Sequence, residues 1–354
     1  MNTDTHDSTV EVRAGLDFDL TQLDGYLAQH MPEYTGPLQV RQFKGGQSNP
    51  TYLLTTPRRR YVLRRKPPGA LLASAHAVDR EYRVLTALGR ASDVPVPRTR
   101  LLCTDATVIG TWFYVMDFVP GRIFWDAALP EILPHHRARY FEAMVDALAA
   151  VHRVDLAAAG LLDFGKPAQY ISRQIARWSR QYLEDEAAGR VDAMDRLIEW
   201  LPQHLPADEP GTLVHGDFRI DNLMFDPVEP VVLAILDWEL STLGHPLADF
   251  AYTVMMYRMP PMGVTGLLGR DLGALQLPSE SQYVDMYCRR TGRSGIPDLD
   301  FYVAFNFFRL AGILHGIRGR VQRGTAASAQ ARQHAANVEA VANIAWQQAQ
   351  QMRL

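Results

Sequence analysis

The feature that most constrains this 354-residue chain is a stretch from Leu213 to Tyr252 in which two apolar, strand-like runs each end in polar residues. The first run leads into His-Gly-Asp-Phe-Arg-Ile-Asp-Asn, so Asn222 follows Asp217 by five residues. The second run, Val-Val-Leu-Ala-Ile-Leu, leads into Asp237. A β-turn could account for the Gly and the Asp. The first spacing alone is expected by chance on the order of once in a thousand chains of this length.

These residue types at these spacings fit phosphoryl transfer. The carboxylate of Asp217 can accept the proton of an attacking hydroxyl, and the amide oxygen of Asn222 is a hard, neutral ligand suited to Mg²⁺. A carboxylate at the end of a buried strand, as predicted for Asp237, is unfavourable unless it is paired or bound to a cation. Glu239 is a weaker candidate for the same metal or phosphate, and Asp221 is a weaker candidate for the base.

Composition excludes several classes of protein. The chain is 47% hydrophobic and 21% charged with a net charge of −3, which argues against a binder of nucleic acid or of a membrane surface. Two cysteines, Cys103 and Cys288, make no disulfide framework. The N-terminus lacks the pattern of a secretory signal, and no apolar run approaches the roughly 18 residues of a membrane span. We therefore expect a cytoplasmic protein; the sequence gives no prediction of its oligomeric state.

Residue patterns divide the chain into two parts. Strand-like runs dominate the first third, and amphipathic helices dominate the remainder. Val-Pro-Gly at 119–121 is the best candidate for an interdomain hinge, because Pro and Gly interrupt regular structure. We predict an α+β protein with an N-terminal lobe over residues 1–119, built on an antiparallel sheet, and a mainly helical C-terminal lobe over residues 120–354. The predicted strands cover 38–43, 51–56, 61–65, 101–104 and 111–119 besides the two central runs, and the clearest predicted helices cover 16–31, 76–88, 137–152, 301–320 and 331–350.

The chain resembles the aminoglycoside phosphotransferase and choline kinase branch of the protein kinase-like fold. Gly216 stands where protein kinases have Arg, and Asp-Trp-Glu stands in place of Asp-Phe-Gly. Within that branch, Gly-Gly-Gln-Ser-Asn-Pro-Thr-Tyr, Tyr-Val-Leu-Arg-Arg-Lys-Pro-Pro-Gly and Asp-Trp-Glu-Leu-Ser-Thr-Leu-Gly-His-Pro-Leu-Ala-Asp look most like the phosphotransferase domains associated with acyl-CoA dehydrogenases. The resemblance implies a two-lobed kinase-like fold, a structural His215, and an Asp249 that braces the catalytic loop.

A glycine-rich turn and a basic strand are the candidates for binding the phosphates of ATP. Glycines let backbone N–H groups approach phosphate, although Gly-Gly between strands is also ordinary hairpin chemistry. By alternation along the following strand, Arg64 and Lys66 share one face and Arg65 lies on the other. The resemblance favours Arg64, paired with Glu81 on the next helix; Arg65 and Lys66 remain alternatives, and we expect Arg65 to be solvated. The candidate turn consists of Gly45, Gly46, Gln47, Ser48 and Asn49.

The resemblance also assigns a role to the segment before the hinge. Its backbone is expected to bind adenine, while the alternative is a strand end within the core. The segment consists of Met116, Asp117, Phe118 and Val119.

Together these features predict transfer of the γ-phosphoryl group from ATP, with Mg²⁺, to a hydroxyl of a small molecule. The similarity to dehydrogenase-associated domains suggests a hydroxyacyl-CoA as acceptor. Arginines of a predicted helical insert (Arg173, Arg177 and Arg180) could face an anionic acceptor, and Asn306 and Arg309 are further candidate substrate contacts. The alternatives are a catalytically silent, nucleotide-binding regulatory protein and a hydrolase that uses water as acceptor.

One similar-looking motif has a different explanation. Gly-Leu-Leu-Asp-Phe-Gly-Lys-Pro at 160–167 nearly matches a P-loop, but Pro167 stands where Ser or Thr must bind Mg²⁺. The segment also follows a predicted helix rather than a buried strand. We therefore reject a P-loop.

Overall fold

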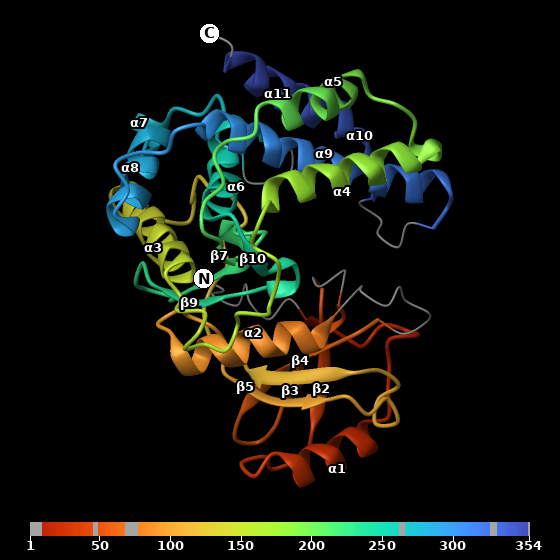
Figure 1. Cartoon of the computed structure of the whole chain (residues 1–354). Helices are drawn as coiled ribbons and strands as arrows, with labels where there is room; N and C mark the ends of the chain where they lie inside the picture. Colours follow the sequence, from red (N-terminus) through yellow and green to blue (C-terminus); the bar gives the residue numbers. More distant parts are fainter. Residues whose placement is uncertain (1–8, 45–48, 68–76, 262–265, 326–330, 353–354) are drawn as a thin grey trace. The chain divides into compact units, whose positions relative to one another are not determined.

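The structure, a computed structural model, describes residues 9–44, 49–67, 77–261, 266–325 and 331–352 (Figure 1). These residues form two compact units. The first contains the described residues up to Phe124 together with 154–162 and 221–241; the second contains 125–153, 163–220 and the described residues from 242 onward. The expected lobe boundary between residues 119 and 120 stays a prediction. No helix among the described residues combines the length and apolarity that crossing a membrane requires.

An antiparallel sheet forms the centre of the first unit. Among the described residues it has six strands in the order β1-β2-β3-β4-β6-β5. Arg64 in β4 lies opposite Thr51 in β3 and Tyr114 in β6. The strands are β1 (Thr9–Val10), β2 (Gln39–Phe43), β3 (Thr51–Thr55), β4 (Arg60–Arg65), β5 (Thr99–Cys103) and β6 (Phe113–Asp117).

Each face of this sheet is covered by one helix (Figure 1). Helix α1 (Leu20–His30) packs Leu23 and Leu27 into a core that includes Leu63 of β4. It begins at Leu20 and not at residue 16, because the carboxylate of Asp19 accepts the first free N–H groups of the helix. Helix α2 (Val78–Ala91) contacts β5 and β6 on the other face. Alternation along β4 therefore sends Leu63 to the α1 side and Arg64 to the α2 side.

A short hairpin completes the first unit. Strands β8 (Leu223–Phe225) and β9 (Val232–Ile235) pair antiparallel, with Leu223 opposite Ile235. Two 3-10 turns, η3 (Ile220–Asn222) and η4 (Trp238–Leu240), flank the open end of the hairpin. The carboxylate of Asp226 closes the connecting turn by accepting the N–H groups of Val228 and Glu229, each at 2.9 Å.

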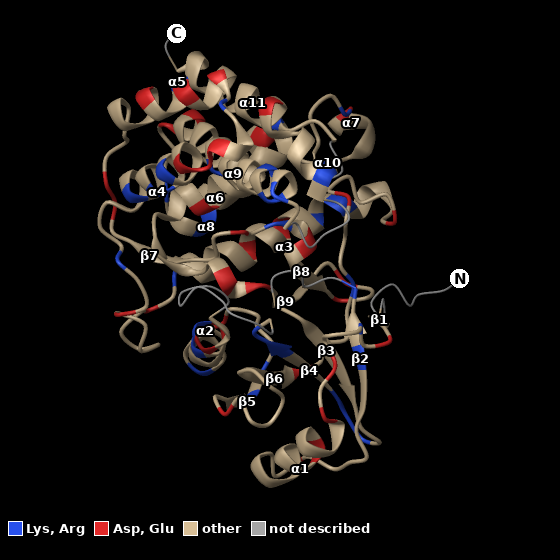
Figure 2. Ribbon diagram, turned by 90° about the vertical axis from the view of Figure 1, so that its right-hand side faces the viewer, with Lys and Arg blue, Asp and Glu red and all other residues tan. Residues whose placement is uncertain are grey.

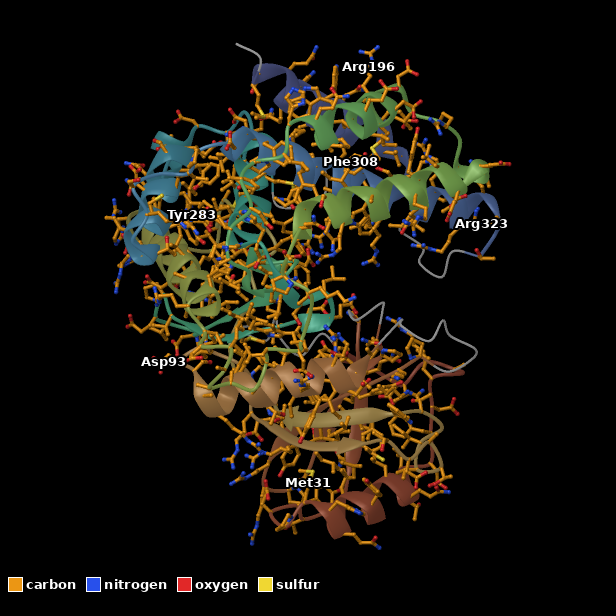
Figure 3. The ribbon with its side chains drawn as sticks, viewed as in Figure 1. Met31, Asp93, Arg196, Tyr283, Phe308 and Arg323 are labelled. Atoms are coloured by element: carbon orange, nitrogen blue, oxygen red, sulfur yellow. The ribbon has the colours of Figure 1, made fainter. Side chains whose placement is uncertain are left out.

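The second unit is mainly helical. Helix α6 is buried from Pro246 to Tyr257, and α9 contacts α4, α6 and α11; Figure 3 shows Phe308 of α9 surrounded by packed side chains. A small sheet pairs β7 (Thr212–Val214) with β10 (Thr242–Gly244). The helices are α3 (Pro134–His152), α4 (Tyr170–Glu184), α5 (Asp192–Trp200), α6 (Pro246–Arg258), α7 (Leu272–Leu275), α8 (Glu280–Thr291), α9 (Leu299–Gln322), α10 (Ala331–Ala336) and α11 (Val338–Gln351), with 3-10 turns η1 (Glu186–Ala188) and η2 (Leu201–Gln203).

Candidate functional site

Asn222 and Asp237 lie at the open end of the β8–β9 hairpin, in the first unit. The N–H of Leu236 donates to the carbonyl of Asn222 at 2.8 Å, which ties the residue before β8 to the residue after β9. Antiparallel pairing thus brings the two predicted metal ligands to neighbouring backbone positions, although they are far apart in sequence.

A buried guanidinium, that of Arg64, joins this end of the hairpin to the sheet. Its Nε donates to Glu81 Oε2 at 3.1 Å, and its Nη2 donates to Asp237 Oδ1 at 2.9 Å. Glu239 Oε2 lies 4.0 Å from the same Nη2. Arg64 is 8% exposed and Glu81 is 2% exposed. The expected pairing of Arg64 with Glu81 is present.

The two alternatives to Arg64 have other partners. The expectation that Arg65 is solvated is wrong: it is 2% exposed and donates to the carbonyls of Ile109 and Leu16, each at 3.0 Å. Alternation points it to the α1 face, where its guanidinium lies 5.1 Å from the ring centre of Phe18. Lys66 Nζ lies 3.7 Å from Asp79. Arg64 is thus the member of the three that contacts both Glu81 and Asp237.

The charges around Arg64 are unbalanced. Burial lowers the pKa of Arg64, but the charges of Glu81 and Asp237 outweigh it and hold that pKa above its usual value. Burial raises the pKa of Glu81, and the guanidinium opposes part of this rise. When ionised, three carboxylates, those of Glu81, Asp237 and Glu239, face one guanidinium. The cluster then carries an excess of negative charge that a bound divalent cation would balance.

The donor chemistry at this cluster fits Mg²⁺. In phosphoryl-transfer sites Mg²⁺ is held by one or two carboxylates together with phosphate oxygens and water. The side chain of Asp237 is 36% exposed, and the backbone of Asn222, whose side chain carries an amide oxygen, is hydrogen-bonded to the preceding residue Leu236. Within the described ranges, no group of three or more His, Cys, Asp and Glu residues is arranged to hold a metal.

Asp237 also has an unusual backbone. Its φ is 61°, in the left-handed region that a non-glycine residue rarely adopts. The indole of Trp238 fixes the next residue by donating to the carbonyl of Ile235 at 2.9 Å, and Ser241 Oγ donates to the carbonyl of Trp238 at 2.6 Å. Strained residues that are held in this way cluster at functional sites.

Four residues of the predicted phosphate turn, Gly45, Gly46, Gln47 and Ser48, lie outside the described residues. Asn49 is described and is 1% exposed; its Nδ2 donates to Glu239 Oε2 at 3.5 Å. Its Oδ1 has no hydrogen-bond partner among the described residues. A buried acceptor normally has a partner, so a ligand with a hydroxyl or a bound water would suit this position.

The backbone of the predicted adenine segment is partly occupied. The N–H of Asp117 donates to the carbonyl of Arg98 at 2.9 Å, and the N–H of Phe118 donates to the carbonyl of Arg60 at 3.3 Å. The N–H of Val119 makes no hydrogen bond to another described residue. Of these three backbone N–H groups, that of Val119 is therefore the one with which adenine could form a hydrogen bond.

The side chains of Met116 and Asp117 in the same segment make contacts within the sheet. Met116 is 7% exposed and lies opposite Val62 of β4. The carboxylate of Asp117 accepts two hydrogen bonds from Arg100, both at 2.7 Å. An adenine ring here would meet the backbone rather than the Asp117 carboxylate.

The loop that carries Asp217 belongs to the second unit and is held by Asp249. The Asp249 carboxylate accepts the N–H of His215 at 2.7 Å and the N–H of Gly216 at 2.8 Å, and His152 Nε2 lies 3.2 Å from it. These contacts are the bracing expected of Asp249. His215 is fully buried, and its Nδ1 accepts the N–H of Asp217 at 3.2 Å, in line with a structural role. Gly216 has a φ of 84°, which favours glycine.

Asp217 itself faces two groups that the sequence analysis did not identify. Its side chain is 22% exposed, and Arg219 Nε lies 3.4 Å from its Oδ1. The hydroxyl of Tyr252 donates a hydrogen bond to it; burial and the charge of Asp217 raise the pKa of Tyr252, so the phenol stays protonated. Tyr252 follows Asp249 by three residues on α6, a spacing that places both on one helix face and could have identified it.

The expectation that Asn306 and Arg309 contact substrate is wrong. Arg309 is 7% exposed, and its Nη2 donates to the carbonyl of Gly216 at 2.6 Å. Asn306 is 1% exposed, and its Nδ2 donates to the carbonyl of Ala248 at 2.8 Å. Both residues are buried supports: α9 packs against α6, so Asn306 reaches the start of α6 and Arg309 reaches the Asp217 loop.

A row of exposed arginines runs along α4, whose ribbon carries Lys and Arg positions on several turns in Figure 2. Burial raises the pKa of Tyr170, the first residue of α4, and the charges that act on it are those of Arg309, Asp249, Arg173 and Arg177. The Tyr170 hydroxyl thus lies in the field of two α4 arginines and of two residues that hold the Asp217 loop. Farther along, a hollow of about 490 Å³ is lined by Arg177, Arg180, Gln181, Glu184, Asp185 and Arg323, the last at the end of α9 (Figure 3).

Protonation of Asp249 is expected to destabilise the protein in acid. Burial raises the pKa of Asp249, but its hydrogen bonds from His152 and the loop outweigh this and hold the pKa below its usual 3.8. Between the folded-state pKa and 3.8, the unfolded chain binds more protons than the folded chain, so stability rises with pH in that range. The stabilisation is complete above about 3.8 and is lost as pH falls through the folded-state pKa. Urea unfolding from pH 7 to 3 should show a weaker acid dependence in Asp249→Asn than in the unmodified chain; parallel curves would contradict this.

Comparisons with known proteins agree with this arrangement. The family described as "Phosphotransferase enzyme family" matches residues 39–278. The chain is 46% identical over 327 residues to "Acyl-CoA dehydrogenase family member 10" of Mus musculus, an alignment that covers 92% of this chain and 30% of that protein. The chain spans less than half the length of the curated relatives it matches.

Two solved structures are similar. One, from Ralstonia eutropha and described as a candidate aminoglycoside phosphotransferase, is 47% identical with a TM-score of 0.86 over 95% of this chain and 99% of that chain. Spectinomycin phosphotransferase, in complex with ADP and spectinomycin, has a TM-score of 0.62 at 11% identity over 93% and 99% of the chains, which shows a shared fold. The predicted α+β, kinase-like fold, with its antiparallel sheet and mainly helical remainder, is confirmed.

Proposed function

The chain belongs to the phosphotransferase enzyme family, and we propose that it moves the γ-phosphoryl group of ATP to a hydroxyl of a small molecule, with Mg²⁺ as metal cofactor. The observation that carries the proposal is the Arg64 cluster, in which a buried guanidinium meets Glu81 and Asp237 at the open end of the β8–β9 hairpin. An enzyme of this class works mostly by positioning and by neutralising charge.

Each residue of the cluster has a place in this proposal. Asn222 and Asp237 would hold Mg²⁺, which when bound neutralises charge on the phosphates. Arg64 offers a planar fork of N–H donors to phosphate oxygens, and Glu81 fixes the direction of that fork. The other proposed ATP contacts are the phosphate turn (Gly45, Gly46, Gln47, Ser48 and Asn49) and the adenine segment (Met116, Asp117 and Val119).

Asp217 would accept the proton of the attacking hydroxyl. Its carboxylate is partly exposed, while the backbone on its N-terminal side is fixed by Asp249 and His215. A base that is held by its backbone and open at its carboxylate can meet a substrate hydroxyl in a defined orientation.

For the acceptor we propose an anionic alcohol, with a hydroxyacyl-CoA as the specific candidate. Similar chains form part of proteins named as acyl-CoA dehydrogenases, so a thioester of CoA could serve both parts of such a protein. The exposed arginines of α4 would face the phosphates of CoA; the charges of Arg173 and Arg177 act on the same Tyr170 hydroxyl as those of Arg309 and Asp249, which hold the Asp217 loop. A polycationic aminoglycoside fits this row less well, because like charges repel. The cytoplasmic location stays a prediction.

Replacing Arg177 by Ala is expected to raise KM for a hydroxyacyl-CoA about two- to fivefold, which is the change in affinity expected from the loss of one solvent-exposed ion pair. KM for ATP should not change. Arg196→Ala is the matched control: both arginines are exposed and lie over a tryptophan ring, Arg177 at 5.3 Å from Trp178 and Arg196 at 5.8 Å from Trp346 (Figure 3). Steady-state kinetics of both variants give the answer. An unchanged KM in Arg177→Ala and in Arg173→Ala would remove the anionic acceptor from the proposal.

The function is tested by ADP release from ATP across a panel of alcohols. The panel contains hydroxyacyl-CoAs, choline-like amines and aminoglycosides, each with and without a chelator of Mg²⁺. Release that one class stimulates and the chelator abolishes supports the proposal and identifies the acceptor. Release without any acceptor, at a rate that none changes, supports a hydrolase. Binding of ATP with no release under any condition supports the silent regulatory protein.

A further inference from the structure

We infer that Tyr252 is a positioning residue for phosphoryl transfer, whose hydroxyl holds the Asp217 carboxylate in the orientation that receives the substrate proton. This inference rests on the proposed function. It concerns a side chain that contacts the base and takes no proton itself.

The contact comes from within the second unit. The Tyr252 hydroxyl donates to the Asp217 carboxylate, and Arg219 Nε lies 3.4 Å from Oδ1 of the same carboxylate. The side chain of Asp217 is 22% exposed, so it would otherwise be free to rotate into solvent. A hydrogen-bonded hydroxyl and an ion-paired guanidinium therefore limit the rotation of a carboxylate that has only two oxygens.

The ring of Tyr252 is itself fixed. Tyr252 is 7% exposed, and the guanidinium of Arg309 lies 5.3 Å from its ring centre. The same guanidinium donates to the carbonyl of Gly216 at 2.6 Å, next to Asp217 in the chain. A hydroxyl on a ring with only two side-chain torsions, packed in this way, has little freedom.

Helix α6 makes this support rigid. It carries both Asp249, which binds the N–H groups of His215 and Gly216, and Tyr252 one turn later. The helix is buried along its whole length from Pro246 to Tyr257. One helix thus fixes the backbone of the loop with one residue and the carboxylate of the base with another, which is the kind of supporting shell that precise catalysis needs.

The kinetic test replaces Tyr252 by Phe, which removes the hydroxyl and keeps the ring. We expect kcat to fall about 10- to 100-fold, because a base displaced by a fraction of an ångström to an ångström loses that much. KM and Kd for ATP should stay within about twofold, since the ATP contacts proposed above belong to other residues. Tyr257→Phe is the matched control: Tyr257 lies on the same helix, is 6% exposed, and its hydroxyl has no hydrogen-bond partner among the described residues. That variant should keep the kcat of the unmodified chain.

An unchanged kcat in Tyr252→Phe would overturn the inference. This includes a loss of kcat/KM for ATP that comes entirely from a rise in KM, because such a loss reports nucleotide binding and not the orientation of the base.

A measurement without turnover separates this inference from the proposed function. Urea unfolding of Tyr252→Phe, Asp217→Ala and the double variant forms a double-mutant cycle, in which contacting side chains show a coupling that differs from zero. Coupling together with the loss in kcat supports the positioning role. Additive effects overturn the contact even if the chain is an active kinase. If the unmodified chain releases no ADP with any acceptor, the proposed function fails, and the positioning role fails with it whatever the coupling.

Discussion

Replacing Asp217 by Asn is expected to lower kcat by about 10²- to 10⁴-fold, the range for loss of a general base. Asn keeps the size of the side chain and can still contact Tyr252 and Arg219, but it cannot take a proton from the acceptor hydroxyl. The backbone of the loop should be unaffected, since it is held by Asp249 and His215. Rapid-quench measurement of a single turnover, with ATP binding measured by calorimetry, separates the chemical step from nucleotide affinity.

Asp221→Asn is the informative control for this variant. Asp221 lies in the same loop region and is the other carboxylate near Asn222 in sequence. We expect a much smaller loss of kcat in Asp221→Asn. If its kcat falls as far as predicted for Asp217→Asn while Asp217→Asn stays active, the base is Asp221 and the spacing argument is wrong.

Replacing Arg64 by Met is expected to destabilise the protein by about 3–5 kcal/mol, because it leaves the buried carboxylate of Glu81 without its partner. Glu81 is 2% exposed and makes contacts with both Nε and Nη2 of Arg64. The loss should become smaller as pH is lowered. Burial raises the pKa of Glu81, so in the variant acid converts it to the neutral form that tolerates burial. Denaturant unfolding at pH 5 and pH 8 measures both effects.

Lys66→Met provides the comparison on the same face of β4. Lys66 Nζ pairs with the partly exposed Asp79 at 3.7 Å, so its loss should change stability by less than about 1 kcal/mol. Adding Glu81→Gln to Arg64→Met should restore part of the stability without restoring phosphoryl transfer. Equal stability of Arg64→Met and Lys66→Met would show that the Arg64 pair does not stabilise the fold.

Sequence reasoning works where a local rule fixes the geometry. Strand alternation predicts that Arg64 and Arg65 point to different faces of the sheet, and in the structure they do. The second apolar run forms β9 and ends before Asp237, as its pattern indicates. The first run forms β7, which pairs with β10; Asn222 lies beside Leu236 because β8, a different strand, pairs with β9. The order of strands and helices likewise indicated the α+β fold.

It fails where the partner comes from a distant segment. Nothing local shows that Arg65 finds buried carbonyl acceptors at Ile109 and Leu16, or that Arg309 reaches back to Gly216. The hydroxyl of Tyr252 is a similar case, because its contact with Asp217 depends on where α6 packs. Buried polar side chains take partners that only the folded chain brings together.

Arg64 serves both the stability of the fold and the proposed binding of phosphate, whereas Asp217 serves the proposed chemistry. This difference has evolutionary consequences. A descendant that abandoned catalysis could replace Asp217 with little effect on folding, since that side chain is partly exposed. The same descendant would have to keep Arg64 or change Glu81 at the same time, because the pair is buried. Among diverged copies of this gene, an intact Arg64 therefore reports only a folded protein, whereas an intact Asp217 reports selection for chemistry.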